Sequence, residues 1–235
     1  LVNVPYSTLA RKSDIVLPIC AGMEIAVIST KAYNAMLFVY YLLACHIELT
    51  LSNSKNNSQK IANVLQPLTN INFFKNQKQI DSFVDLILQN EKIFFIGKGQ
   101  DYVTSLEASL KLKEITYINC ISIPSGELKH GTLSLVDNKS LVFLTVTKKE
   151  LLDKNLSSSN EIKSRGGKVV LVTNLNLCKK QLANIDYVFT FAKCDQDFAS
   201  MLGIIFYQLV AYKTCLRLGK NPDKPRNLAK SVTVE

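Results

Sequence analysis

Three groups of side chains in this chain of 235 residues could move protons or bond covalently to a substrate. The first is Glu107, Lys111 and Glu114, whose spacing of four and three residues puts them on one face of a helix. A carboxylate beside a cation can transfer a proton between neighbouring carbon atoms while the cation holds an oxygen of the substrate. Exposed helix faces stabilised by ion pairs have the same spacing. The spacing alone therefore leaves both interpretations open.

His130 and Lys230 form the other two groups. His130 lies in a loop between Gly126 and Gly131, and an imidazole that titrates near neutral pH can donate a proton to a substrate oxygen. Lys230 lies close to the last residue. A deprotonated lysine condenses with a carbonyl to form an imine, and the charge of Arg226 nearby disfavours the ammonium form. A solvated surface residue is the alternative for each.

From residue 92 onward, short apolar runs alternate with longer stretches of helical character. We expect strands at residues 92–96, 119–123, 140–146, 168–173 and 186–191, and helices at 103–117, 151–165 and 198–218. This alternation predicts an α/β fold, with a doubly wound parallel sheet covered on both faces. The first strand ends in Gly97-Lys98-Gly99, at the edge where such sheets place ligands, although two glycines also suit a tight turn.

The first fifty residues resemble only the end of this unit. An expected strand at 13–19 leads to an apolar helix at 29–49, as residues 184–189 lead to the helix from 198. We interpret this as a duplication whose first copy lacks its beginning. Residues 1–51 would end a first domain, 52–220 would form a second, and 221–235 a C-terminal tail. A polar linker at 52–58 and helical segments near 59–68 and 79–89 would join the copies.

Composition weakens a nucleic-acid-binding interpretation. The net charge is +9, but only four of the 28 basic residues are arginines, and the lysines are scattered. A basic face for phosphates would gather these charges in one place. A solvated lysine surface is therefore favoured.

Cysteine and histidine usage argues against a metal site. The six cysteines are widely separated and only two histidines occur, so we expect reduced thiols in a cytoplasmic protein, no zinc site and no cofactor. The longest apolar run, at 35–45, has eleven residues. A bilayer span needs about 20, so this run predicts a buried helix. Because the chain opens with Leu1, we also expect natural sequence upstream of it.

Four stretches resemble the glutamine–fructose-6-phosphate aminotransferase family, the glucosamine-6-phosphate synthases. They are PRNLAKSVTVE at 225–235, LEASLKLKEI at 106–115, SGELKHG at 125–131 and AGMEIAVISTKA at 21–32. The resemblance implies the C-terminal isomerase part of that family, built from sugar isomerase (SIS) domains with a flavodoxin-like sandwich fold. The family's glutaminase half has no counterpart here. Its phosphate-binding Ser/Thr loop would precede Leu1.

The resemblance also implies roles for individual residues. Lys230 would form an imine with C2 of fructose 6-phosphate, Glu114 would transfer a proton from C1 to C2, and Lys111 would support charge on the sugar oxygens. His130 would open the sugar ring from the neighbouring subunit, which implies a homodimer. Ammonia from the glutaminase domain would complete glucosamine 6-phosphate. Other residues implied at the substrate are Val27, Ser29 and Ala229, with Glu107 and Arg226 in support.

The stretch at 21–32 carries two structural expectations. Ser29 or Thr30 would cap the helix that follows, and Glu24 would be a structural carboxylate of the loop.

Three alternatives stay open at this point. A phosphosugar-binding regulatory module of the same fold would need neither Glu114 nor Lys230. A nucleic-acid-binding domain would show binding that depends steeply on salt. A folded but inactive fragment would follow if the first repeat is incomplete.

Overall fold

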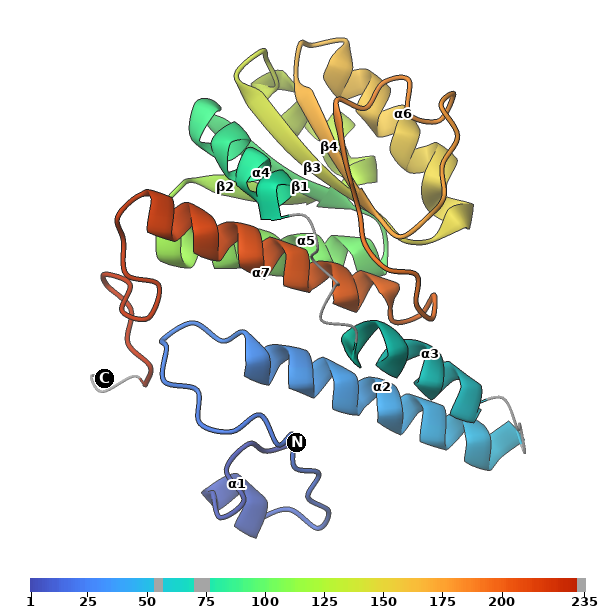
Figure 1. The fold of residues 1–235 in the computed structure, drawn as a ribbon, viewed down its shortest axis with the longest axis vertical. Coiled ribbons are helices and arrows are strands. Elements are labelled where there is room, and N and C mark those ends of the chain that lie inside the picture. The colour runs from blue at the N-terminus through green and yellow to red at the C-terminus, as the bar shows by residue number, and fades with distance from the viewer. Residues whose placement is uncertain (53–56, 70–76, 232–235) are drawn as a thin grey trace. The chain divides into compact units, whose positions relative to one another are not determined.

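The computed structural model describes residues 1–52, 57–69 and 77–231, and Figure 1 traces the chain. It consists of two compact units. The terminal unit contains Leu1–Leu65 and Pro222–Glu235, and the sheet unit contains Gln66–Asn221. The predicted linker residues 53–56 and the tail residues 232–235 lie outside the described residues.

The sheet unit is built around five parallel strands in the order β2-β1-β3-β4-β5. The strands are β1 (Lys92–Gly97), β2 (Cys120–Pro124), β3 (Ser140–Val146), β4 (Lys168–Thr173) and β5 (Tyr187–Thr190). Their sequences are almost continuously apolar, as expected of parallel strands covered on both faces. The predicted α/β fold with a doubly wound parallel sheet is confirmed.

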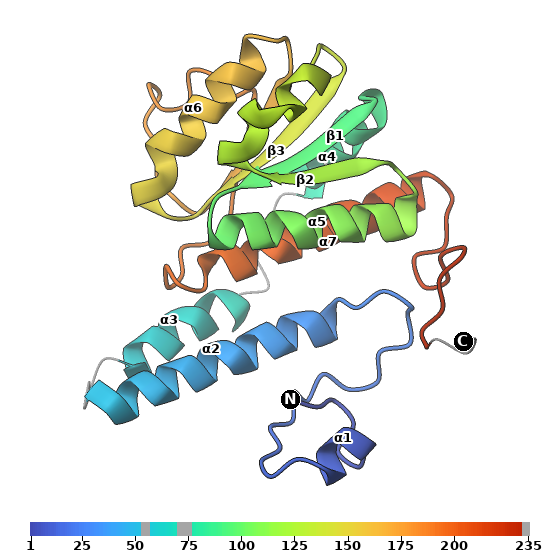
Figure 2. The same ribbon diagram turned by 180° about the vertical axis from the view of Figure 1, so that it is seen from behind.

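Helices cover both faces of this sheet. On one face lie α4 (Gln77–Gln89), α5 (Gln100–Thr116) and α7 (Ala199–Arg217), and α5 and α7 run side by side in both views (Figures 1 and 2). On the other face lie α6 (Leu152–Lys163) and the short 3-10 helices η2 (Ser125–His130) and η3 (Thr132–Leu135), which connect β2 to β3. A further 3-10 turn, η4 (Lys149–Leu151), precedes α6.

Alternate residues of the strands supply two cores. Phe94 and Ile96 point to the α6 face and pack in one cluster with Ile162. Phe95 points the other way, where its ring stacks on Phe143 with centroids 5.2 Å apart. Burial of large aromatic and branched side chains on both faces of the sheet stabilises this unit.

The predicted boundaries agree closely with these elements. All five strands in this unit are confirmed to within about one residue, and α7 differs by one residue at each end. The helix predicted to start at 103 begins at Gln100, directly after Gly99, whose φ is +61°. The helix predicted at 151–165 ends earlier, at Lys163, and Gly166 (φ +85°) turns the chain after it.

The terminal unit holds α1 (Thr8–Arg11), α2 (Lys31–Ser52) and most of α3 (Asn57–Thr69), within which the unit boundary falls. The expectation of a strand over the whole of residues 13–19 was wrong. Only an isolated parallel bridge, Val2 to Pro18, forms there. A strand needs a neighbouring strand along its length, and among the described residues Val2 alone pairs with this segment.

Among the described residues, two helices, α2 and α7, are long and apolar enough to cross a membrane by length and composition alone. In α7, 61% of the apolar window is buried, as in the core helix of a globular protein, whereas in α2 the share is 11%. The helix predicted around residues 35–45 is confirmed, but its expected burial was wrong for the described structure. The helix runs on to 22 residues, and its buried residues are Ala32, Tyr41 and Cys45.

Candidate active site

Glu107, Lys111 and Glu114 of α5 form a largely buried cluster. Lys111 Nζ lies 2.7 Å from Glu114 Oε2 and 3.6 Å from Glu107 Oε1, and 4% of the Lys111 side chain is exposed. The three residues therefore share one helix face, and the exposed ion-pair interpretation was wrong. Burial raises the pKa of Glu107, opposed by the charge of Lys111 and reinforced by that of Glu114. One cation between two carboxylates leaves the cluster with an unbalanced negative charge.

The turn from β1 into α5 lies at the carboxyl edge of the sheet, and the cluster lies further along α5, from its middle to its C-terminal end. Because β1 lies between β2 and β3, α5 begins at the point where the strand order reverses, the usual ligand crevice of such sheets. A Cβ on Gly97 would lie 2.5 Å from the backbone of Asp101. Gly97 is thus needed for the close approach of the α5 backbone, which favours the tight-turn interpretation of these glycines.

Asp101 fixes the first turn of α5, and the sequence analysis did not single it out. Its carboxylate accepts hydrogen bonds from the backbone N–H of Thr147 at 2.9 Å and from the Thr147 hydroxyl at 2.6 Å. Burial raises the pKa of Asp101 to about 6, against the lowering effect of these hydrogen bonds. An acidic residue in the first turn of a helix was the available signal.

His130 is the last residue of η2 and lies at the surface. Its side chain is 73% exposed, and Nε2 lies 4.0 Å from Glu127 Oε2. Beside it Lys129, Gly131, Ser134 and Arg165 line an open depression of about 540 Å³. The chain therefore presents His130 outward and leaves its imidazole accessible.

Lys230 makes its side-chain contacts within the terminal unit. Its Nζ lies 3.2 Å from Glu24 Oε2 and donates a hydrogen bond to the Ala26 carbonyl at 2.8 Å. The backbone N–H of Val27 donates to the Asp223 carbonyl at 3.0 Å. The tail and the loop at 22–27 thus meet at two places.

Glu24, in the loop before α2, caps the start of this helix with its side chain. Its Oε1 accepts hydrogen bonds from the backbone N–H groups of Thr30 at 2.9 Å and Ala32 at 3.3 Å. Two otherwise unpaired donors of the first turn are satisfied in this way. The expected cap from Ser29 or Thr30 was therefore incomplete, whereas Glu24 is the structural carboxylate that was expected.

The predicted residues thus fall into two groups, each described within its own unit. Glu107, Lys111, Glu114 and His130 belong to the sheet unit. The terminal unit contains Val27, Ser29, Arg226, Ala229 and Lys230.

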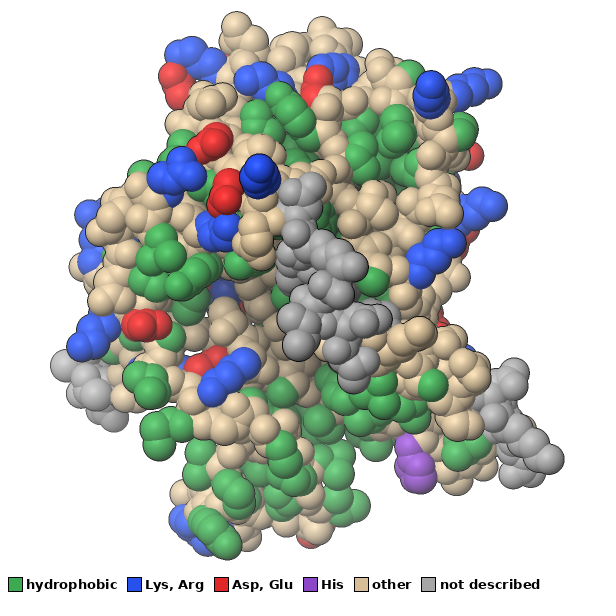
Figure 3. Space-filling model, in the orientation of Figure 1, with side chains coloured by type: hydrophobic (Ala, Val, Ile, Leu, Met, Phe, Trp, Pro, Cys, Tyr) green, Lys and Arg blue, Asp and Glu red, His purple; other side chains and the backbone are tan. Residues whose placement is uncertain are grey.

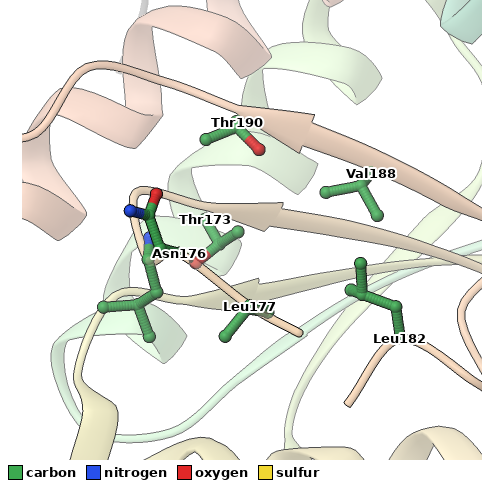
Figure 4. Close-up of a pocket in the computed structure, with 7 residues that line it drawn as sticks. Thr173, Asn176, Leu177, Leu182, Val188 and Thr190 are labelled. Atoms are coloured by element: carbon green, nitrogen blue, oxygen red, sulfur yellow. Dashed lines mark hydrogen bonds between the residues drawn. The ribbon is translucent and has the colours of Figure 1, made fainter. Parts of the chain in front are cut away.

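A cavity of about 230 Å³ lies at the ends of β4 and β5. Figure 4 shows Thr173 and Thr190 from the strands, with Leu177 and Leu182 from the loop between them. The Thr173 hydroxyl already donates to the Val146 carbonyl at 2.6 Å. No residue predicted for catalysis lines this cavity, and its walls are mainly apolar.

Comparisons with known proteins show which family the chain resembles. The SIS domain family matches residues 86–202. Glutamine–fructose-6-phosphate aminotransferase of Caldanaerobacter subterraneus is 38% identical over 240 residues, covering 100% of this chain and 39% of that protein. The chain therefore spans well under half the length of this curated relative.

Solved structures give the same result. The C-terminal domain of the Francisella tularensis aminotransferase has a TM-score of 0.79 and 34% identity over 94% of this chain and 63% of that one. The sugar isomerase domain of an RpiR transcription factor from Sphaerobacter thermophilus shares the fold, with a TM-score of 0.55 and 16% identity over 69% of this chain and 88% of that one.

Proposed function

This chain belongs to the SIS domain family and is similar over its whole length to the C-terminal region of glutamine–fructose-6-phosphate aminotransferases, and from this premise we propose that it is an isomerase part of such an enzyme. It would form glucosamine 6-phosphate from fructose 6-phosphate and glutamine-derived ammonia. The observation that carries the proposal is the buried Glu107–Lys111–Glu114 cluster on α5. Burying these charges costs stability, and a module that only binds a sugar would not need a carboxylate for proton transfer.

The proposed reaction starts with ring opening and imine formation. His130 donates a proton to the ring oxygen while the C2 hydroxyl loses its proton to solvent, and the furanose opens to the ketone. The neutral amine of Lys230 then attacks C2, and water leaves as the C=N bond forms. Ammonia next attacks the imine carbon and displaces the lysine amine, which regenerates Lys230 and leaves nitrogen on C2.

Glu114 completes the reaction by moving a proton between carbon atoms. Its carboxylate takes a proton from C1 to give an enolamine and returns it to C2. The proton of the O1 hydroxyl passes to the nitrogen, so that C1 becomes the aldehyde and C2 carries the amine. Lys111, 2.7 Å from Glu114, offers its ammonium to the sugar oxygens. Glu107 holds Lys111 from the other side at 3.6 Å.

We further propose a homodimer in which His130 serves the site of the neighbouring subunit. The outward position of its side chain, 73% exposed, supports a role outside its own unit. The remaining partner is a glutaminase domain that supplies ammonia, in a cytoplasmic enzyme.

The domain organisation remains part of the proposal. Residues 1–51 would be the end of a first SIS domain, 52–220 the second and 221–235 the tail. The parallel bridge of Val2 with Pro18 supports the duplication. Its two residues are 16 apart in the sequence, and Thr173 and Thr190, which pair in the sheet unit, are 17 apart.

Basic side chains stand apart from one another on the face shown in Figure 3, which gives no support to the nucleic-acid alternative. The regulatory-module alternative rests on fold alone, through the RpiR domain.

Turnover separates these functions. We would incubate the chain with fructose 6-phosphate and ammonium ions and measure glucosamine 6-phosphate, beside Glu114→Gln and, as a control, exposed Glu91→Gln. Product from the parent chain and from Glu91→Gln, with a loss of about 10² or more in Glu114→Gln, is the expected result. Sugar binding without turnover would favour the regulatory module.

A further inference from the structure

One carboxylate joins the start of α2 to the C-terminal tail. Oε1 of Glu24 accepts from the first-turn N–H groups of Thr30 and Ala32, and Oε2 lies 3.2 Å from the Lys230 ammonium. The Glu24 side chain is 10% exposed, whereas that of Lys230 is 45% exposed. The carboxylate is therefore a fixed feature of the loop, and the lysine comes to it from the solvent side.

The loop around Glu24 is held by contacts that do not involve the tail. The Asn3 side chain donates to the Gly22 carbonyl at 2.7 Å and accepts from the Ala21 N–H at 3.1 Å. Lys31 Nζ donates to the Met23 carbonyl at 2.6 Å. These bonds hold a turn in which Gly22 has a φ of +69°. The loop is thus preorganised, and the tail takes its position from the loop.

Lys230 and Asp223 are the two tail residues that contact this loop through the bonds described above. Asp223 contributes its carbonyl to the Val27 N–H, which is a backbone contact that any residue at 223 would make. Lys230 contributes the side chain. The position of its Nζ therefore depends on Glu24 and on the Ala26 carbonyl 2.8 Å away.

We propose that Glu24 is a positioning residue that seats the C-terminal tail by pairing with Lys230 in the resting state. This deepens the proposed function, because it rests on Lys230 being the nucleophile. Burial raises the pKa of Glu24, but hydrogen bonds from Thr30, Ala32 and Lys230 outweigh burial, and the net pKa is below its ordinary value. Glu24 is accordingly ionised at neutral pH, as the ion pair requires.

Trypsin cleavage after Arg226 measures how often the tail leaves its seat, since proteolysis follows the population of the open form. In Glu24→Gln the amide oxygen can still cap α2 while the charge is lost. We expect cleavage after Arg226 to become about two- to fivefold faster, with cleavage after Lys12 in the same unit unchanged. Lys230→Gln should give the same increase, and the double variant should add nothing to either single change.

The matched control is Glu48→Gln, which removes the ion pair of Glu48 with Lys60, 2.9 Å apart in the same unit. It should leave cleavage after Arg226 unchanged. Unaltered cleavage in Glu24→Gln, or effects of the two substitutions that simply add, would overturn the proposal.

Trapping with borohydride and fructose 6-phosphate tests the proposed function separately. If no adduct forms on Lys230 but Glu24→Gln still loosens the tail, the nucleophile assignment fails and the seating contact stands. If the adduct forms and Glu24→Gln leaves cleavage after Arg226 unchanged, only the seating contact is wrong.

Discussion

Lys111 Nζ lies 2.7 Å from Glu114 Oε2 in a cluster where 4% of the lysine side chain is exposed. A buried ion pair contributes little net stability, but removing one partner leaves an uncompensated charge. The pair is therefore better explained by a function on this face of α5 than by a need for stability.

Replacing Lys111 by Met should be strongly destabilising. Glu107 and Glu114 would remain together without their cation, at a cost of about 3 kcal/mol in the free energy of unfolding. Urea unfolding at neutral pH measures this change. The control is Lys113→Met on the exposed side of α5, which should shift the free energy by about 0.5 kcal/mol or less. Equal effects of the two substitutions would contradict a buried cluster that needs its cation.

Asp101 should make stability depend on pH in the acid range. Its folded-state pKa of about 6 lies above the ordinary 3.8, so the folded chain binds the proton more tightly than the unfolded chain between these values. The contribution is greatest below pH ~4 and falls by up to about 3 kcal/mol as the pH rises to ~6. Asp101→Asn should remove this part of the pH dependence, measured as the difference between the two urea-unfolding profiles. Identical slopes between pH 4 and 6 would show that Asp101 does not titrate there.

Gly97 should tolerate no side chain. A Cβ there would lie 2.5 Å from the Asp101 backbone, so Gly97→Ala must shift α5 and should lower the free energy of unfolding by about 2 kcal/mol. Gly126→Ala is the matched control, because nothing lies within 4 Å of its Cβ position. Thermal unfolding of the two variants should separate them clearly, and a silent Gly97→Ala would refute the close approach.

Mixing two inactive variants should test whether His130 acts across subunits. In a hybrid dimer of His130→Ala and Lys230→Ala, one site would regain both native residues. Random exchange of subunits would then restore about a quarter of the parent activity, given the two-fold symmetry of a dimer. Activity that stays absent after verified exchange would place His130 in its own subunit's site.

The sequence predicted the sheet unit well because its signals are local. Short apolar runs marked the five strands, and the spacing of Glu107, Lys111 and Glu114 placed them on one face. Burial of that face was not legible, since an exposed helix has the same spacing. The Glu24 cap on α2 and the Asp101 bond to Thr147 join residues separated by loops or by whole elements. Pairs of this kind carry no periodic signal in a single sequence.

The terminal unit shows the limit of local patterns more clearly. Residues 13–19 have strand composition, yet only Pro18 forms a bridge, because a strand exists only where a neighbouring strand can pair with it. The apolar helix α2 likewise indicated burial, but few of its residues are covered in the described structure. The composition of these two segments shows only which structures they could form. Whether a strand forms, or a helix is buried, depends on a partner from elsewhere.

The most direct test of the central claim is to trap the imine. The chain would be incubated with fructose 6-phosphate and borohydride, and the modified residue located by mass spectrometry, with Lys230→Arg and exposed Lys113→Arg as matched variants. A reduced sugar adduct on Lys230 that persists in Lys113→Arg and vanishes in Lys230→Arg is the predicted result. An adduct spread over surface lysines, or none on Lys230 even when upstream sequence is added, would contradict the assignment of Lys230 as the nucleophile.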